Sequence, residues 1–293
     1  MFTLAHLSDW HLAAWPRLAE LAGKRGLGFI NWQRGRKTVH RPEILEATIG
    51  DLQTCQFDHI AVTGDLVNLS LPDEYRRARG WLETLGQPRD VTVVPGNHDI
   101  YVGAVKQSPA AFWGDYMRGD AGDDGVERFP FVRRRGNVAM IALSSALPTA
   151  PFLATGRLGQ SQLARLAATL DQTRGLFRIV LIHHPPATPP RRYLRRLVDA
   201  PELRRVLAAN GAELLLHGHD HRRSLVWLDG PRGKIPAVGV PSASARAPHG
   251  DEDAAGYNLF RIDGEAGAWH CEMIARQRGT DGIVRDVERR ILI

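Results

Sequence analysis

The sequence predicts an α/β protein of a single domain, built on a parallel or mostly parallel sheet. Apolar runs of strand length alternate with runs of helical spacing between residues 2 and 94, which is the βαβαβ order of a parallel sheet. From residue 223 onward the chain instead offers several short strand-like runs, which we expect to form a second, more antiparallel sheet on the same core. Because no linker interrupts the chain, we assign residues 1–293 to one domain.

Local patterns predict each element. Apolar and β-branched runs predict strands at residues 2–7, 59–63, 91–94, 138–143, 178–182 and 213–216, and shorter ones at 225–228, 235–240, 258–262 and 269–274. Helices are expected to begin at Pro42, Pro72 and Pro201, because proline is favoured in the first turn of a helix. A further helix is expected around residues 163–170, where apolar side chains recur at helical spacing.

Composition is that of an ordinary globular protein, with 293 residues, 43% hydrophobic and 24% charged. The net charge of +6 favours an anionic substrate, but we treat this excess as small and scattered and expect no nucleic-acid polymer as partner. Cys55 and Cys271 are far apart and lie in no metal-binding spacing, so we expect buried thiols rather than a disulfide, which suits a reducing compartment. Without a signal-peptide pattern or an apolar stretch of about 18 residues, a cytoplasmic protein is expected.

Residues 13–41 interrupt the alternation of strands and helices, and we call them the basic insertion. Its part from 23 to 37 mixes five basic residues with Phe29, Ile30 and Trp32. Such a segment could contact a membrane surface or lipid, or bind an acidic substrate. The alternative is an excursion that packs its few apolar groups against the domain, and its four glycines disfavour a long amphipathic helix.

Polar clusters follow five of the predicted strands. They contain seven side chains with donor atoms for a metal: Asp9, His11, Asp65, Asn97, His183, His219 and His221. In an open α/β sheet the carboxyl ends of the strands converge on one crevice. Seven donors are too many for one ion and suit two divalent cations bridged by one carboxylate. Imidazole combined with carboxylate and amide fits Zn, Mn, Fe or Co.

The other histidines are expected to have supporting roles. His184 and His217 are adjacent to candidate ligands, so on an extended backbone they point to the opposite face. Five more belong to no cluster and are interpreted as ordinary structural or surface residues: His6, His40, His59, His249 and His270.

The polar clusters together resemble the calcineurin-like metallophosphoesterase superfamily. The matching motifs are Asp-x-His (Asp9, His11), Gly-Asp (Gly64, Asp65), Gly-Asn-His-Asp (96–99), Val-x-x-His (Val180, His183) and Gly-His-x-His (Gly218, His219, His221). The resemblance implies a four-layer α/β/β/α sandwich, with two mixed sheets packed face to face between flanking helices, and a dinuclear metal centre. Carried over by motif, one ion would be bound by Asp9, His11, Asp65 and His221, and the other by Asp65, Asn97, His183 and His219. Asp65 would then bridge the two ions.

Within this superfamily the chain looks most like the class III cyclic-nucleotide phosphodiesterases. Gly-Asp-Leu followed by Glu74-Tyr75, and the His-His-Pro-Pro run at 183–186, carry this likeness, whereas the basic insertion departs from compact members. The resemblance thus implies a metal-dependent phosphodiesterase. Two cations would neutralise the phosphate oxygens and lower the pKa of a bridging water toward about 7, giving a hydroxide that attacks phosphorus in line with the leaving oxygen.

His98 is the expected non-ligand, which contacts the phosphate or protonates the leaving oxygen, with Asp99 orienting it. The alternative activities are a phosphomonoesterase and a pyrophosphatase acting on a nucleotide-linked lipid precursor, and the basic insertion would favour the latter. A non-catalytic scaffold is a further alternative, against which the complete set of ligand positions argues.

Overall fold

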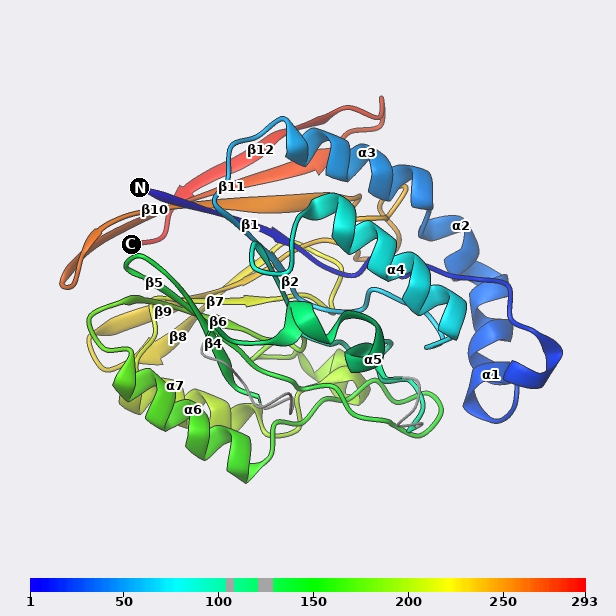
Figure 1. Cartoon of the computed structure of the whole chain (residues 1–293), viewed down its shortest axis with the longest axis horizontal. Coiled ribbons are helices and arrows are strands. Elements are labelled where there is room, and N and C mark those ends of the chain that lie inside the picture. Colours follow the sequence, from blue (N-terminus) through cyan, green and yellow to red (C-terminus); the bar gives the residue numbers. More distant parts are fainter. Residues whose placement is uncertain (104–107, 121–128) are drawn as a thin grey trace.

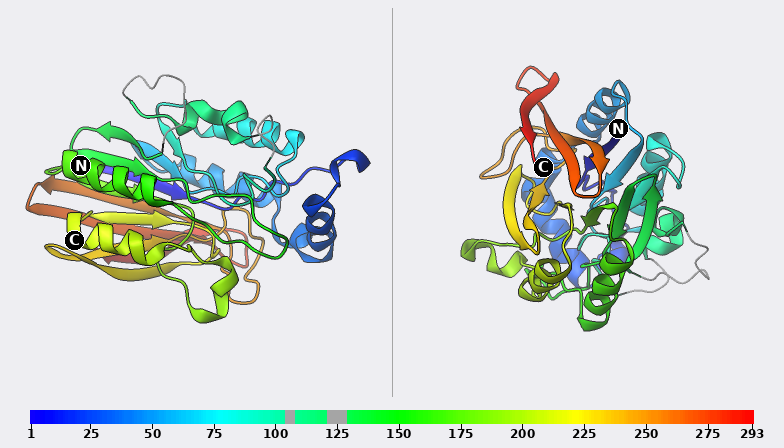
Figure 2. Two further views of the ribbon diagram at one scale, coloured as in Figure 1. Left: turned by 90° about the horizontal axis from the view of Figure 1, so that it is seen from below. Right: turned by 90° about the vertical axis from the view of Figure 1, so that its left-hand side faces the viewer.

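Two six-stranded mixed sheets pack face to face, and helices cover their outer sides (Figures 1 and 2). The computed structural model describes residues 1–103, 108–120 and 129–293. The main apolar cluster draws on both sheets, as Val93, Met140 and Phe260 illustrate. This is the four-layer α/β/β/α arrangement that the resemblance implied.

The first sheet has the order β12-β11-β10-β1-β2-β3. Its parallel half consists of β1 (Phe2–Leu7), β2 (His59–Val62) and β3 (Val91–Val93). Its antiparallel half consists of β10 (Gly256–Glu265), β11 (Ala268–Arg278) and β12 (Val284–Ile291). Helices α3 (Pro42–Gln53) and α4 (Pro72–Leu85) bury apolar residues against this sheet, as their sequence spacing predicted.

The second sheet has the order β4-β5-β6-β7-β9-β8. Its strands are β4 (Phe131–Arg135), β5 (Val138–Ala142), β6 (Phe177–Leu181), β7 (Leu214–His217), β8 (Ser224–Gly230) and β9 (Gly233–Gly239). Helices α6 (Gln160–Gln172) and α7 (Ala200–Asn210) cover it through a second apolar cluster. Across the sandwich, Phe177 of β6 meets Trp269 of β11 edge to face, with ring centroids 5.7 Å apart.

The expectation that the strands after residue 223 form a second, more antiparallel sheet is wrong. Instead β8 and β9 extend the second sheet, while β10 to β12 extend the first. The reason lies in β1, which pairs with β2 on one side and still offers a free edge on the other. The antiparallel strand β10 occupies that edge, with Leu4 opposite Phe260.

The basic insertion is helical despite its glycines. It contains η1 (Leu18–Glu20), α1 (Lys24–Asn31), a π-helical turn at Trp32–Arg36 and α2 (Lys37–Val39). One glycine has a packing reason: a Cβ on Gly28 would lie 2.7 Å from Leu69 and 2.5 Å from the Tyr101 hydroxyl. The short helices α5 (Pro109–Trp113), η4 (Gly114–Met117) and η5 (Pro190–Arg195) complete the described elements.

Two further expectations concern the cysteines and membrane-spanning segments. Cys55 and Cys271 are both free thiols, as predicted, but only Cys271 is buried as expected, whereas Cys55 is half-buried. Among the residues that the structure describes, no helix is both long and apolar enough to cross a membrane.

Candidate active site

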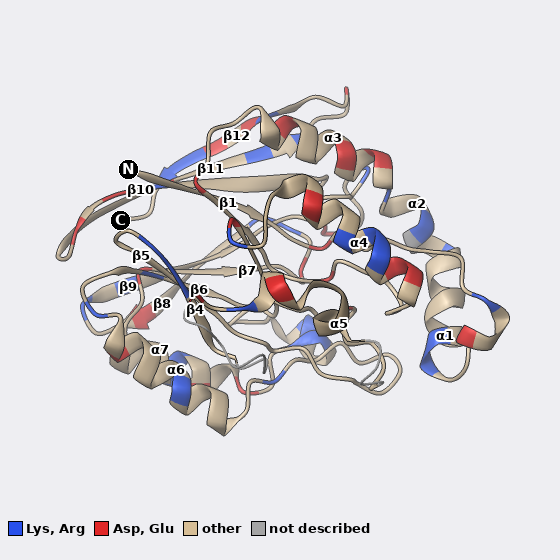
Figure 3. Ribbon diagram, viewed as in Figure 1, with Lys and Arg blue, Asp and Glu red and all other residues tan. Residues whose placement is uncertain are grey.

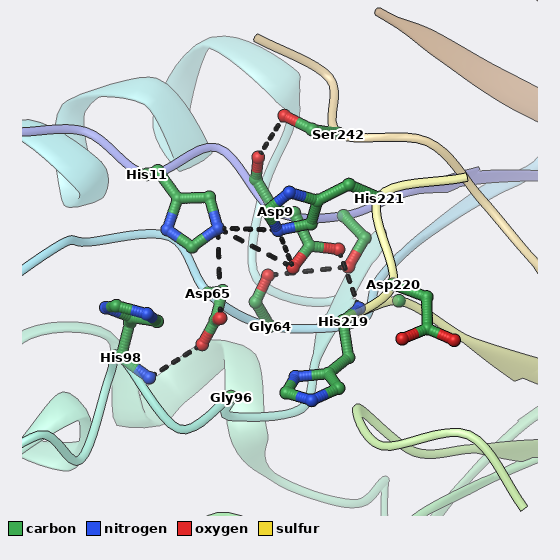
Figure 4. Close-up of polar contacts among 12 residues, drawn as sticks. Asp9, His11, Gly64, Asp65, Gly96, His98, His219, Asp220, His221 and Ser242 are labelled. Carbon is green, nitrogen blue, oxygen red and sulfur yellow. Dashed lines mark hydrogen bonds and ion pairs between the residues drawn. The ribbon is translucent and has the colours of Figure 1, made fainter. Parts of the chain in front are cut away.

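The seven predicted donors all lie in buried loops at one edge of the sandwich. The loops follow β1, β2 and β3 of the first sheet and β6 and β7 of the second, so both sheets contribute. Parallel strands end at the same edge, which explains why residues more than 200 positions apart meet (Figure 4).

One side of the site gathers around Asp9. Its Oδ1 lies 3.3 Å from Nε2 of His221 and 3.8 Å from Nε2 of His11. The two imidazoles face one another, with 2.9 Å between their Nε2 atoms. A carboxylate oxygen and two ring nitrogens therefore converge on a single point.

The other side gathers around Asp65 and two further histidines. Oδ2 of Asp65 lies 3.3 Å from Nε2 of His183, whose Nε2 is 3.1 Å from Nδ1 of His219. The same Oδ2 is 3.9 Å from Nε2 of His11, so the Asp65 carboxylate faces both sides of the site. Asn97 is buried in the adjoining loop after β3.

Backbone strain is concentrated at these donors. Seven described non-glycine residues have positive φ, and five of them are donors: Asp9, His11, Asp65, His219 and His221. Left-handed backbone is unfavourable for side chains with a Cβ and persists where the surrounding structure holds it. The loops are therefore held in conformations that aim these side chains inward.

Glycines allow the loops to approach the carboxylates closely. A Cβ on Gly96 would clash with the Asp65 carboxylate, and one on Gly218 would clash with Ser8 and Asp9. Both glycines belong to the sequence motifs, and these clashes explain why those motif positions require glycine.

The pKa values of the candidate ligands show that the buried carboxylates stabilise positive charge beside them. Burial opposes ionisation of Asp65, but His183 and His98 outweigh it and lower its pKa. Burial also opposes charge on His183 and His221, yet Asp65 and Asp9 respectively raise each pKa to about 9. Burial lowers the pKa of His219, and neighbouring histidines lower it further.

The donor set fits divalent cations. Buried Oδ1 atoms of Asp9 and Asn97 have no hydrogen-bond partner among the described residues. Among the described residues, four groups of three side chains each have donor atoms within 4.8 Å of one another: His11, His40 and His221; His183, His184 and His219; His11, Asp65 and His98; and Asp9, Asp65 and His183. Three of these groups include a histidine outside the predicted ligand set, namely His40, His184 or His98. Mixed nitrogen and oxygen donors suit first-row transition metals.

Asp99 has a different task from the predicted one. Its carboxylate accepts hydrogen bonds from the backbone N–H groups of Asp65, Leu66, Val67 and Gly96, at 2.8–3.2 Å. Nδ1 of His98 instead lies 2.6 Å from the carbonyl oxygen of Asn68. The expectation that Asp99 orients the His98 ring is therefore corrected: Asp99 holds the loop after β2, and the Asn68 carbonyl orients His98.

His40, interpreted from sequence as ordinary, lies against two of the donors. Its ring centroid is 4.5 Å from that of His11 and 5.3 Å from that of His221. Its Nδ1 is 3.0 Å from the Ser244 hydroxyl and 3.2 Å from the Ser242 hydroxyl. Sequence analysis missed this residue because no motif links the end of the basic insertion to the site.

Glu252 is the second residue that sequence analysis missed. Its Oε2 lies 3.0 Å from Nδ1 of His221. A carboxylate on the far nitrogen of a candidate ligand fixes the tautomer and orientation of the ring. No local pattern marks Glu252, which is 31 residues from its partner.

The remaining histidines have mostly structural roles. His184 is buried, with Nδ1 2.8 Å from the Ser145 hydroxyl, but its ring also lies 4.3 Å from that of His219. His217 is buried beside Gly239. Burial lowers the pKa of both His6 and His59 to about 3. His249 and His270 are exposed.

A two-sheet sandwich with carboxylates and imidazoles at its strand ends defines the metallophosphoesterase class. The chain belongs to the calcineurin-like phosphoesterase family, whose sequence profile matches residues 2–223. It is therefore a phosphoric ester hydrolase of a metal-dependent family.

One curated relative and two solved structures are similar to this chain. A Synechococcus protein described as a probable cyclic nucleotide phosphodiesterase is 27% identical, and the match covers 92% of this chain and 91% of the relative. Purple acid phosphatase PPD1 from yellow lupin shares the fold, with a TM-score of 0.60 at 14% identity over 97% of this chain. Sulfate thiohydrolase SoxB from Thermus thermophilus has a TM-score of 0.52 at 16% identity over 99%. The chain spans 52% and 55% of these two structures.

A substitution separates the structural task of Asp99 from a catalytic one. Asp99→Asn replaces one acceptor oxygen with an NH₂ group facing backbone N–H donors, so we expect a loss of stability on the order of 2–4 kcal/mol. Denaturant unfolding measures this loss. A variant of unchanged stability but reduced kcat would contradict the assignment and restore the orienting role.

His40→Ala tests whether the basic insertion supports the metal ligands. Loss of the ring beside His11 and His221 should weaken metal affinity or kcat/KM by roughly 10–100-fold, as for other outer partners of metal ligands. Metal titration and initial rates measure both quantities, with the exposed His270→Ala as the matched control. If both variants behave like the wild type, His40 is only a packing residue.

Proposed function

We propose that the chain is a dinuclear metal-dependent phosphodiesterase. The observation that carries this proposal is the position of Asp65, whose Oδ2 faces His183 at 3.3 Å and His11 at 3.9 Å. A carboxylate between two groups of donors is the arrangement in which two cations share one ligand.

The donors divide into two sets around Asp65. One set contains Asp9, His11 and His221, and the other contains Asn97, His183 and His219. The contacts within each set support this division: Asp9 meets His221 at 3.3 Å, and His183 meets His219 at 3.1 Å. Mn, Fe, Zn and Co all accept such nitrogen and oxygen donors.

Bound cations would neutralise the oxygens of the phosphoester and activate a water for attack. The chain itself supplies His98 as the general acid. Because the Asn68 carbonyl occupies Nδ1 of this ring, Nε2 is the atom that would carry a proton to the leaving oxygen. Tyr101 stacks on His98 with ring centroids 5.5 Å apart, which limits rotation of the ring.

A phosphodiester is the preferred substrate class. The Synechococcus relative is described as a probable cyclic nucleotide phosphodiesterase, and it matches this chain over nearly the full length of both. Phosphomonoester hydrolysis remains an alternative within the same chemistry. The filled donor positions and the family assignment argue against a non-catalytic scaffold.

A cavity beside the site favours a second candidate function. This candidate is a pyrophosphatase acting on a nucleotide-linked lipid precursor. One cavity of about 460 Å³ is lined by His11 together with Trp32 and Lys37 of the basic insertion. Such a lining offers apolar surface and positive charge for the part of a substrate that does not react.

A substrate panel tests the proposed activity. The enzyme loaded with manganese should hydrolyse bis(p-nitrophenyl) phosphate and cyclic nucleotides with a kcat/KM at least about tenfold above that for p-nitrophenyl phosphate, a difference of about 1.4 kcal/mol. Chelation should abolish the activity. Faster cleavage of the monoester would favour the phosphomonoesterase, and faster cleavage of a nucleotide-diphosphate lipid would favour the pyrophosphatase.

His98→Ala tests the general acid. Turnover should fall by about 10²-fold or more, because proton transfer to the leaving oxygen is lost. Metal content, measured by elemental analysis, should not change, since the imidazole of His98 is not among the proposed ligands. Unchanged turnover would refute the role, and a parallel loss of metal would reassign His98 as a ligand.

A further inference from the structure

The net positive charge of the chain is concentrated in the basic insertion, which corrects the expectation that it is scattered. Residues 13–41 contain seven Lys and Arg and a single acidic residue, Glu20. The remaining chain contains 31 basic and 31 acidic residues. The net charge of this one segment of 29 residues therefore equals the whole net charge of +6. Figure 3 colours the basic and acidic positions along the chain.

The same segment exposes large apolar side chains. Leu18 is 91% exposed and Trp15 64%, while Leu27 and Ile30 are each about half exposed. Trp15 also packs with Phe29 and Trp32, with ring centroids 5.5–5.9 Å apart. Exposed apolar residues surrounded by basic ones are typical of segments that lie in a membrane interface.

The helical part of the basic insertion presents apolar and basic residues on one face. Leu27, Ile30 and Arg34 are spaced by three and four positions, which places them along one side of a helix, and all three are exposed. The Lys37 ammonium lies 5.3 Å from the Trp15 ring and 5.8 Å from the Trp32 ring. The basic insertion projects from the body of the sandwich, where a flat surface can reach it (Figures 1 and 2).

Exposed aliphatic residues distinguish a lipid surface from a nucleic acid. Bases would stack on Trp15, but Leu18, Leu27 and Ile30 offer no flat aromatic face for stacking. Burial of these aliphatic side chains among acyl chains would instead be favourable. The acidic groups near the segment include Glu20, which accepts the Arg17 backbone N–H, and Glu43, which pairs with Arg41. Glu46 lines the cavity beside Lys37, and Glu252 lines the cavity beside Arg34.

The basic insertion also borders the candidate active site. Its last residues include His40, which contacts His11 and His221, and Gly28 of α1 packs on Tyr101, the residue stacked on His98. A cavity of about 270 Å³ between the segment and the site is lined by Asn31, Arg34 and His221 among others. A surface that held the segment would therefore lie beside the entrance to the site.

We propose that the basic insertion docks the protein on an anionic lipid bilayer. The exposed apolar residues enter the interface, and Arg34 and Lys37 meet the acidic headgroups. In a second step, which rests on the proposed phosphodiesterase function, docking presents a phosphoester of a lipid headgroup to the candidate metal site.

Co-sedimentation with vesicles tests the docking without relying on activity. The full chain should bind vesicles of phosphatidylcholine and phosphatidylserine, bind phosphatidylcholine alone much more weakly, and lose binding as salt rises. The double reversal Arg34→Glu/Lys37→Glu should reduce binding by at least about tenfold, since each basic residue near an anionic surface contributes to the attraction. Leu27→Ser/Ile30→Ser should also reduce it, through the apolar contact.

Matched controls lie on other parts of the surface. Arg232→Glu/Lys234→Glu makes the same change of charge, and the exposed Trp227→Ala removes an aromatic ring from β8. Both should bind vesicles like the wild type. Asp65→Asn should also keep vesicle binding while losing hydrolysis, so a failure of the catalytic account is distinguishable from a failure of docking.

Three results would overturn the docking proposal. The first is a wild-type chain that does not sediment with anionic vesicles at low salt. The second is an equal loss of binding in the variants of the basic insertion and in the controls, which would indicate attraction without a defined surface. The third is binding of a single-stranded RNA oligonucleotide in the absence of vesicle binding, which would assign the segment to nucleic acid.

Discussion

The Asp65 carboxylate is the constraint on which the active-site architecture depends. Asp65 follows β2 in the first sheet. Its Oδ1 accepts a hydrogen bond from the backbone N–H of His98 at 2.7 Å, and its Oδ2 lies 3.3 Å from Nε2 of His183, which follows β6 of the second sheet. A buried carboxylate without compensating charge is strongly unfavourable. Loops from both sheets must therefore bring positively charged groups to Asp65. The way the two sheets pack on each other thus determines the chemistry of the site.

Holding that arrangement requires strain and support around it. Five donors have left-handed backbone conformations, and the buried Asp99 carboxylate accepts four backbone N–H groups from the loops that carry Asp65 and Gly96. Such conformations persist only where other interactions over-determine them. Asp99 therefore holds the loop that carries Asp65, and the Gly-Asn-His-Asp motif combines a proposed general acid with a structural carboxylate.

Sequence alone could predict the parallel strands and the meeting of the loops that carry the seven candidate donors, because parallel strands deliver their ends to one edge. It could not predict β12, whose residues are mostly charged and exposed, nor the sheet to which β10 belongs, because pairing depends on the free edge of β1. His40 and Glu252 were missed because their contacts with the donors span long stretches of chain and follow no motif. The glycines of the basic insertion were misleading, since one of them serves close packing on Tyr101.

Two cations must share Asp65 if the site works as proposed. The basic insertion, through His40, forms one side of the same site. Anomalous diffraction from crystals grown with manganese measures the sharing of Asp65 most directly. The account predicts two manganese peaks roughly 3.5–4 Å apart, with the Asp65 carboxylate between them and Asp9 and His183 on opposite sides. A single peak, or two peaks that Asp65 does not join, would contradict it.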